Sequence, residues 1–500
     1  MSELLSAPAA QRVIRRRKAR DPKPRFRPDR TAQLDAVLGC LEMQVPAGHL
    51  ARRVREWAAP LDVRQVEAGY SSLGCHGYAP RRTLEVWLYA SQVGLHHSTS
   101  LARAMKTDAA LRWLAGGHSM SEGHLRKFRR ENALLFAAGL QRTVQLAAEG
   151  GFLKGEELAV DGMRLRAEAS PTQVRTLERS QKRLAELARV PVQQLDEEAK
   201  RAHEEKRQKH EAAVALCQAQ QRPNVVLTNA GAGLMKFPDG AAGPGHRLTA
   251  CVAGVRERLV VGVLLDAAAS DAGHLGPVLE ATRQALLQAG VPLAAPLQAA
   301  ADAGYFGQED LDWAHANRPW VDVLVAPSLP RARRAADGTR LFGPEAFPID
   351  EKQQATCPAG RPMHGPVQEG PTTLRWRGVG CATCPLKPRC TRGQQRSLKL
   401  DTRAQAARAR MLGRMAQPDA RARYNQRIAT VEPVFSSLQD AMGFRRVSSR
   451  KPEAAHAEVL LKLLAYNLSR LAAAKRLLCV QVSLRPQPGG SWLLLLPAAA

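Results

Sequence analysis

Three acidic residues have carboxylates that could bind a catalytic metal ion: Asp161, Asp302 and Glu432. Asp161 interrupts LAVDGMRL, a segment that alternates in polarity as a half-buried strand does. A charged group in such a strand is unfavourable unless it is paired or binds a metal ion. Asp302 follows a second short strand, in AADAGYF, where Gly304 allows the chain to turn sharply.

If these two strands are neighbours in an open sheet, their carboxylates lie side by side. Like charges at that distance repel each other unless a cation lies between them, and oxygen ligands favour Mg²⁺ or Mn²⁺. Glu432 lies in a predicted helix over residues 424–446, which Gly443 ends. It borders an apolar stripe made of Ile428, Val431, Phe435, Leu438 and Met442. From that edge Glu432 could reach the same sheet end as a third ligand, although a chain with 46 acidic residues contains many such triples.

The segments around these residues predict a mixed α/β core. Strands are expected at 157–170, 246–255, 257–268, 296–306 and 320–327, and helices at 274–290, 308–317 and 424–446. Three strands that lead into alternating helices and strands indicate a mixed sheet with helices on its faces.

Composition divides the chain further. We expect a basic disordered arm (1–40), a helical domain (41–148), a first core segment (155–330) with a helical-hairpin insertion (171–221), a cysteine-rich insertion (331–418), the final core helices (419–475) and a tail (476–500). The helical domain is either a DNA-binding module or a bundle that packs on the rest of the chain; its sequence does not distinguish the two.

The charge predicts a polyanionic partner, of which nucleic acid is the commonest. The formal net charge is +27, and residues 12–30 hold ten basic residues against two acidic ones. Part of this excess is explained by arginine-rich coding, but the clustering is not. We find no signal peptide, and the apolar run in residues 491–500 is too short to cross a bilayer, so a cytoplasmic protein without a membrane partner is expected.

Four cysteines, Cys357, Cys381, Cys384 and Cys390, fall within 34 residues of a segment rich in Pro and Gly. This spacing favours a structural zinc ion, which would supply folding energy to a segment with little core of its own. Buried thiols without a metal and a redox pair are the alternatives, and His364 could replace one ligand.

Three stretches, DGMRLRAEAS, ADAGYFGQEDL and YNQRIATVEPVFSSLQDAMGFRR, resemble in this order the acidic motifs of bacterial insertion-sequence transposases of the DDE class. The last is similar to that group's Tyr-x2-Arg…Glu signature. The N-terminal stretches GYAPRRTLEVWLYA and STSLARAMKTDAALRWLAG resemble the helical domain of one branch of the group, whose members tend to carry cysteines before the catalytic Glu. The resemblance covers roughly residues 40–470.

This resemblance implies an RNase H-like fold in which Asp161, Asp302 and Glu432 hold two Mg²⁺ or Mn²⁺ ions. The implied reaction is cleavage of double-stranded DNA at the element's ends, followed by joining of those ends to target DNA. Tyr424, Arg427, Arg445 and Arg446 would contact DNA, since the planar guanidinium suits phosphate. A homodimer or larger assembly associated with a prokaryotic nucleoid is implied, because two ends must be joined.

The chain also departs from the family's pattern. Gln439 stands where the family usually has Lys, and Asn229 and Gly231 stand where relatives tend to have carboxylates. Two other hypotheses follow: a catalytically impaired remnant that only binds DNA, and a metal-dependent nuclease that only hydrolyses it.

Overall fold

The computed structural model describes residues 25–34, 39–71, 75–153, 157–293, 296–328, 334, 338–479, 483–486 and 492–495. Two compact units emerge from the contacts within the chain. The first comprises residues 1–142, 441–444 and 453–472, and the second comprises the remaining residues.

Helices build the described part of the first unit. They are α1 (Leu41–Gln44), α2 (Leu50–Ala58), α3 (Arg64–Glu67), α4 (Pro80–Gln92), α5 (Ser98–Ala104), α6 (Ala109–Leu114), α7 (Glu122–Glu131), the start of α8 (Ala133–Glu149) and most of α16 (Pro452–Cys479). Helix α4 is buried along most of its length, with Leu84, Val86 and Trp87 fully enclosed. The expected helical N-terminal region is therefore confirmed.

Buried charges join α16 to the N-terminal helices inside this unit. Lys462 is fully buried and its ammonium donates to Ser91 Oγ at 3.0 Å. Glu458, one turn earlier on α16, is also fully buried and lies 3.5 Å from Arg129. Burial lowers the pKa of Lys462 to about 7, and the Glu458 carboxylate opposes that shift.

Part of the basic arm packs on the helical unit. Phe26 forms a β-bridge with Gly77, and Asp29 pairs with Arg82. Arg30 donates its backbone N–H to the carbonyl of Gly116 at 3.0 Å. The prediction of a disordered arm is thus wrong for residues 25–34, because backbone pairing and an ion pair hold them; residues 1–24 lie outside the described part of the chain.

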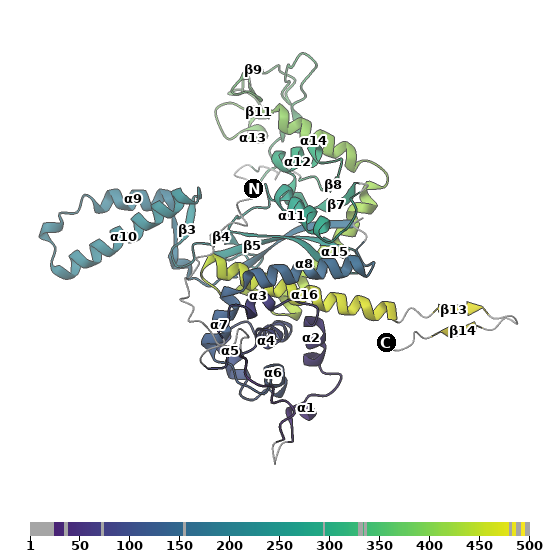
Figure 1. The fold of residues 1–500 in the computed structure, drawn as a ribbon. Coiled ribbons are helices and arrows are strands. Elements are labelled where there is room, and N and C mark those ends of the chain that lie inside the picture. Colours follow the sequence, from purple (N-terminus) through teal and green to yellow (C-terminus); the bar gives the residue numbers. More distant parts are fainter. Residues whose placement is uncertain are drawn as a thin grey trace. The chain divides into compact units, whose positions relative to one another are not determined.

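A mixed sheet forms the centre of the second unit (Figure 1). Its strands are β1 (Glu157–Ala167), β4 (Gly233–Lys236), β5 (Ala242–Ala253), β6 (Leu259–Asp266), β7 (Leu297–Ala301), β8 (Val321–Val325) and β12 (Arg446–Val447). The main order is β4-β5-β1-β7-β8, with β6 paired to β5 and β12 paired to β1. Strand β1 runs antiparallel to β5 and parallel to β7. The predicted α/β core is confirmed, and it is consistent with the RNase H-like fold that the resemblance implied.

Helices cover both faces of this sheet. They are α11 (Leu275–Gln288), α12 (Gln308–Ala316), α14 (Thr402–Met415) and α15 (Ala420–Ser436). Helix α15 packs across β1, β5, β7 and β8, and its Arg427 reaches Asp161. Helix α11 packs on β5 and β6, where Gly262 lies against Val278 and Thr282. Because neighbouring residues of a strand point to opposite faces, the register places Asp161 and Gly262 on opposite sides of the sheet.

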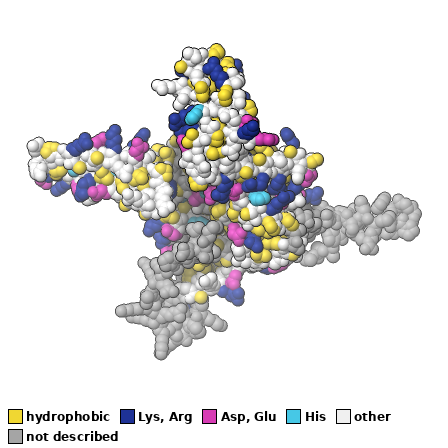
Figure 2. Space-filling view, turned by 90° about the horizontal axis from the view of Figure 1, so that it is seen from above, with side chains coloured by type: hydrophobic (Ala, Val, Ile, Leu, Met, Phe, Trp, Pro, Cys, Tyr) yellow, Lys and Arg dark blue, Asp and Glu magenta, His cyan; other side chains and the backbone are white. Residues whose placement is uncertain are grey.

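Two insertions have their own local structure. Between β2 (Val174–Thr176) and β3 (Asn224–Val226), which pair with each other, α9 (Leu177–Leu187) and α10 (Glu197–Ala219) pack as a long hairpin (Figure 1). Lys, Arg and acidic side chains alternate along this hairpin (Figure 2), and many are ion-paired within one helix, as Arg207 is with Glu204 and Glu211.

The cysteine-rich insertion contains a sheet of β9 (His364–Gln368), β10 (Thr373–Arg377) and β11 (Ser397–Asp401), and the short α13 (Lys387–Cys390). Phe347, Ala355, Met363, Trp376 and Leu398 form a buried cluster there. The expectation that this segment has little core of its own is therefore wrong. Further along the chain, β13 (Ser483–Pro486) pairs with β14 (Trp492–Leu495).

The helix in the structure differs from the one predicted over residues 424–446, both in its limits and in the face that it buries. Helix α15 starts earlier, at Ala420, and a π-helix (Ser437–Ala441) follows it before Gly443 takes a positive φ of 67°. Val431, Leu438 and Met442 are buried as expected, whereas Ile428 is 47% exposed. The buried side of α15 instead includes Arg427 and Thr430, because Arg427 finds a carboxylate partner below the helix.

Replacing Glu458 by Ala should destabilise the helical unit by about 3–5 kcal/mol, because Arg129 and Lys462 would remain buried without that counter-charge. Urea unfolding followed by tryptophan fluorescence measures the loss. The control is Glu453→Ala on the exposed side of the same helix, which should change stability by less than about 0.5 kcal/mol. Equal effects of the two variants would contradict a stabilising role for the buried charges.

Candidate active site

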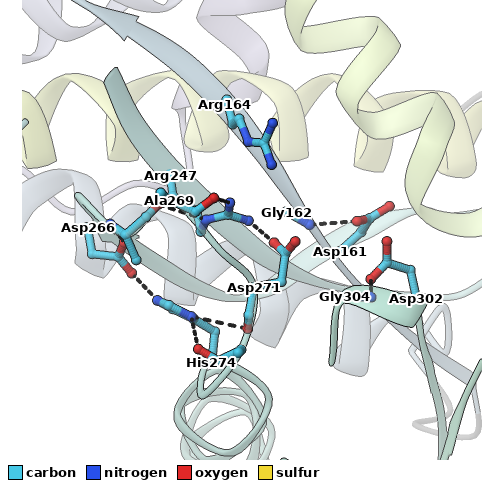
Figure 3. Close-up of polar contacts among 12 residues, drawn as sticks. Asp161, Gly162, Arg164, Arg247, Asp266, Ala269, Asp271, His274, Asp302 and Gly304 are labelled. Atoms are coloured by element: carbon cyan, nitrogen blue, oxygen red, sulfur yellow. Dashed lines mark hydrogen bonds and ion pairs between the residues drawn. The ribbon is translucent and has the colours of Figure 1, made fainter. Parts of the chain in front are cut away.

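Asp161 and Asp302 lie next to each other at the junction of β1 and β7. The parallel register pairs Val160 with Ala301, and each of the two aspartates comes directly after its member of that pair. Each carboxylate accepts a hydrogen bond from a nearby glycine amide: Asp161 Oδ1 from Gly162 N at 2.7 Å, and Asp302 Oδ1 from Gly304 N at 2.8 Å. Figure 3 shows the two side chains facing each other. The structure thus brings together two of the three predicted carboxylates.

The surroundings of Asp161 disfavour its negative charge. Burial raises the pKa of its carboxyl, the nearby Asp302 raises that pKa further, and Arg427 opposes both effects. Arg427 Nη1 donates to Asp161 Oδ2 at 2.8 Å, and 9% of the Arg427 side chain is exposed. A cation beside Asp161 therefore favours its ionised form, and in this structure Arg427 provides that charge.

The predicted DNA-contacting residues fall into two groups. Arg427 is turned inward to Asp161, and its guanidinium carbon lies 5.9 Å from the ring centroid of Tyr424. Arg445 and Arg446 are exposed. Arg445 pairs with Asp440 at 2.5 Å, while Arg446 donates to the carbonyl of Ala167 at 2.8 Å. These two arginines are placed where a solvent-borne phosphate can reach them, and Arg427 is not.

Glu432 does not join the aspartate pair. It lies on α15 five residues after Arg427, and its side chain is exposed. In the part of the chain that the structure describes, no three His, Cys, Asp or Glu side chains are grouped so that they could hold one metal ion. Gln439 Nε2 lies 3.8 Å from the sulfur of Met163, so the position that carries Lys in the family contributes no charge here.

Sequence reasoning missed an arginine and a carboxylate beside the pair. Arg247 lies within β5 and is 1% exposed. Its Nε donates to the carbonyl of Ala268 at 3.0 Å, its Nη2 donates to the carbonyl of Ala269 at 2.8 Å, and its Nη1 pairs with Asp271 (Figure 3). The available signal was an arginine in the otherwise apolar strand HRLTACVAGV, because a buried guanidinium requires a partner.

A second ion pair, between Asp266 and His274, joins the two ends of the loop between β6 and α11, which also carries Asp271. His274 Nε2 lies 2.5 Å from Asp266 Oδ2, and Asp266 Oδ1 accepts from the amide of Ala268 at 2.6 Å. The hydrogen bond to Asp266 raises the pKa of His274, although burial of the imidazole opposes the shift. The pKa of Asp266 is lowered by His274 and by the Ala268 amide, against the opposing effect of burial.

The four cysteines of the insertion line one small cavity. Cys357, Cys381, Cys384 and Cys390 surround it together with Arg361, Leu386 and Arg396, among others. Burial raises the pKa of Cys390, and the other three thiols raise it further. His364 lies on β9 with an exposed side chain and is not among the residues that line this cavity. The structure thus brings the four thiols to one place without arranging three of them as a ready metal site.

Two segments of the chain match known families of transposase domains. Residues 356–472 match the family described as "Transposase DDE domain", and residues 39–131 match the "Transposase domain (DUF772)". Both matches support the assignment of the chain to the insertion-sequence DDE transposases. The first match includes Glu432 and the four cysteines of the transposase, whereas Asp161 and Asp302 lie outside both matched segments.

No match to this transposase was found among curated proteins. Within the described residues, no helix combines the length and the apolar character that crossing a bilayer requires.

The Asp266–His274 pair predicts a pH-dependent effect on stability. Because the pKa of His274 is raised, its pairing stabilises the fold fully below about pH 6.5 and this contribution is lost as pH rises through the folded-state pKa. Because the pKa of Asp266 is lowered, the contribution also requires a pH above about 4. Replacing His274 by Gln should therefore lower Tm more at about pH 5.5 than at about pH 8.5.

Differential scanning fluorimetry at the two pH values measures this difference. His315→Gln, an exposed histidine on α12, is the control and should show no such dependence. A loss of Tm in His274→Gln that is the same at both pH values would rule out the ion pair as its source.

Proposed function

We propose that this transposase cleaves DNA at the ends of its insertion sequence and joins those ends to target DNA. Asp161, Asp302 and Glu432 are the proposed ligands of two Mg²⁺ or Mn²⁺ ions. The observation that carries the proposal is the meeting of Asp161, within β1, and Asp302, directly after β7, where a cation would offset the repulsion between their like charges.

The residues present fit a hard divalent cation. Both aspartates offer carboxylate oxygens, which such ions prefer, and two glycine amides fix the orientation of those carboxylates. When bound, the ions would activate the attacking oxygen and stabilise the leaving oxygen at phosphorus. Glu432 would approach from the exposed side of α15, on the helix whose Arg427 already contacts Asp161.

The proposed partner is double-stranded DNA. Arg445 and Arg446 offer exposed guanidinium groups close in sequence to the end of the candidate catalytic helix, and Tyr424 and Arg427 lie within that helix. Contacts of this kind bind phosphate without reading bases, so they position the duplex. Two element ends must be joined, and a dimer or larger assembly on DNA supplies two such sites.

Two observations favour the alternative of a catalytically impaired DNA-binding remnant. Glu432 stands apart from the aspartate pair, and Gln439 replaces a phosphate-neutralising lysine with a neutral amide. A protein of this kind would bind element ends but would not cut them with either metal.

Replacing Asp161 or Asp302 by Asn, or Glu432 by Gln, should abolish metal-dependent cleavage while changing DNA affinity by less than about twofold, since these groups are proposed to hold metal and not DNA. Gel assays on DNA that carries the element's ends, with Mg²⁺ or Mn²⁺, measure both quantities. Glu309→Gln, an exposed carboxylate on α12, is the matched control and should cut normally. Cleavage that survives in all three variants would remove the assignment.

We further propose that Cys357, Cys381, Cys384 and Cys390 hold a structural zinc ion. The support is their common cavity and the turns that carry them: Gly360 N donates to the Cys357 carbonyl at 2.8 Å, and Cys384 N donates to that of Cys381 at 3.4 Å. Because the segment has its own buried cluster, zinc would fix the loops around the cavity and would not be needed to fold the whole insertion.

Purified protein should contain about one zinc ion per chain, and Cys381→Ser should lower that content and expose the segment to protease. Elemental analysis and limited proteolysis measure these effects. Cys75→Ser, an exposed cysteine elsewhere, serves as the control. Wild-type protein purified without chelator that lacks zinc would refute the proposal.

A further inference from the structure

The loop between β6 and α11 brings a third carboxylate, that of Asp271, beside Gly162 in β1 and Gly304 in the turn after β7, close to Asp161 and Asp302 (Figure 3). Asp271 is absent from the three acidic motifs, and its neighbours are two glycines. One is Gly162, which follows Asp161, and the other is Gly304, two residues after Asp302.

No side chain fits at either glycine while Asp271 is in place. A Cβ on Gly162 would lie 2.6 Å from Asp271 Oδ1 and 3.0 Å from Arg247 Nη1. A Cβ on Gly304 would lie 2.7 Å from Asp271 Oδ2 and 2.9 Å from Asp302 Oδ1. Neither glycine has a positive φ, so a side chain is excluded there by neighbouring side chains, of which the Asp271 carboxylate is the nearest, and not by the backbone conformation.

The same two glycines hold the candidate catalytic carboxylates. The amide of Gly162 donates to Asp161 Oδ1, and the amide of Gly304 donates to Asp302 Oδ1. Any displacement of these glycines therefore moves the carboxylates that they orient. Since the Asp271 carboxylate lies beside both glycines, its position affects the spacing between β1 at Gly162 and the turn at Gly304.

Asp271 is itself fixed. Arg247 binds the loop at Ala268, Ala269 and Asp271. On the other side, the buried Asp310 of α12 accepts hydrogen bonds from Gly273 N at 2.8 Å and from Leu275 N at 3.1 Å. Arg247 also balances the charge of Asp271, so the third carboxylate adds little net repulsion to the pair.

We propose that Asp271, held by Arg247, is a positioning residue that sets the spacing of Asp161 and Asp302 for metal binding. This inference rests on the proposed function, since it assumes that the aspartate pair holds a divalent ion. Asp271 does not contact the substrate in this account; it acts through Gly162 and Gly304.

The test is a Mn²⁺ titration of the purified full-length protein, with free Mn²⁺ followed by electron paramagnetic resonance. Asp271→Ala and Gly162→Ala should each weaken Mn²⁺ binding about tenfold, as losses of supporting residues around metal sites do. Asp271→Asn should retain most of the affinity, because an amide of the same shape still accepts from Arg247. The double variant Gly162→Ala/Asp271→Ala should bind no more weakly than the weaker single variant, since the added methyl group then enters the vacated space.

Asp312→Asn is the matched control. Asp312 on α12 also pairs with arginines, Arg403 and Arg410, but it touches neither glycine, so its loss should leave Mn²⁺ binding unchanged. If Asp271→Ala does not fold, Gly162→Ala decides, because it adds one methyl group beside Asp271, retains the ion pair and, unlike Gly304→Ala, does not place that methyl group against Asp302.

The outcomes separate the two proposals. Wild-type affinity in Asp271→Ala or Gly162→Ala, together with loss of binding in Asp161→Asn, would overturn the role of Asp271 and leave the metal pair standing. Equal Mn²⁺ binding by wild type and Asp161→Asn would overturn both. Weakened, non-additive binding in the Asp271 and Gly162 variants would support the inference.

Discussion

Two carboxylates of like charge meet where β1 and β7 run side by side, and the surrounding structure compensates for their repulsion. Parallel pairing places Asp161 and Asp302 at the same level, each directly after the paired residues Val160 and Ala301, so the backbone itself brings the two aspartates together. Two glycine amides then orient the carboxylates, and Arg427 supplies positive charge from above the sheet. On the opposite face, Arg247 neutralises Asp271 where Asp271 lies beside Gly162 and Gly304. Arg427 thus offsets the repulsion between the two aspartates, and Arg247 offsets the charge that Asp271 adds beside them.

Part of the positive charge of the chain is buried and does not contribute to its surface. Arg129, Arg247 and Arg427 are buried and ion-paired with Glu458, Asp271 and Asp161. A buried guanidinium is stable only with such partners, and these arginines are therefore structural in the state described here. A net charge of +27 thus overstates the positive surface that DNA can reach, and exposed residues such as Arg445 and Arg446 carry that role.

The sequence predicts the central features of this site because they depend on local patterns. Alternation identified the strands of Asp161 and Asp302, and the connection between them allowed parallel neighbours, as the register confirms. Helix periodicity predicted a helix here but misassigned part of the buried face of α15. The pattern counts apolar residues and treats arginine as solvent-facing, whereas Ile428 is exposed and Arg427 is buried. Asp271 was missed for a related reason. Its role depends on two glycines that are distant in sequence, and no periodic pattern links a loop carboxylate to them.

The ion pair between Arg427 and Asp161 also bears on how the proposed site would change on metal binding. Arg427 donates to Asp161 Oδ2, an oxygen that a divalent ion would need, so the guanidinium and the ion compete for one carboxylate. Under the proposed function, Arg427 released from Asp161 becomes free to bind a phosphate in the bidentate geometry that guanidinium favours. Glu432 lies on the same helix, so any shift of α15 that withdraws Arg427 also moves Glu432 relative to the sheet. Glu432 stands apart from the aspartates in the state in which Arg427 neutralises Asp161, so its separation counts toward an impaired protein only if it persists when a divalent ion replaces Arg427.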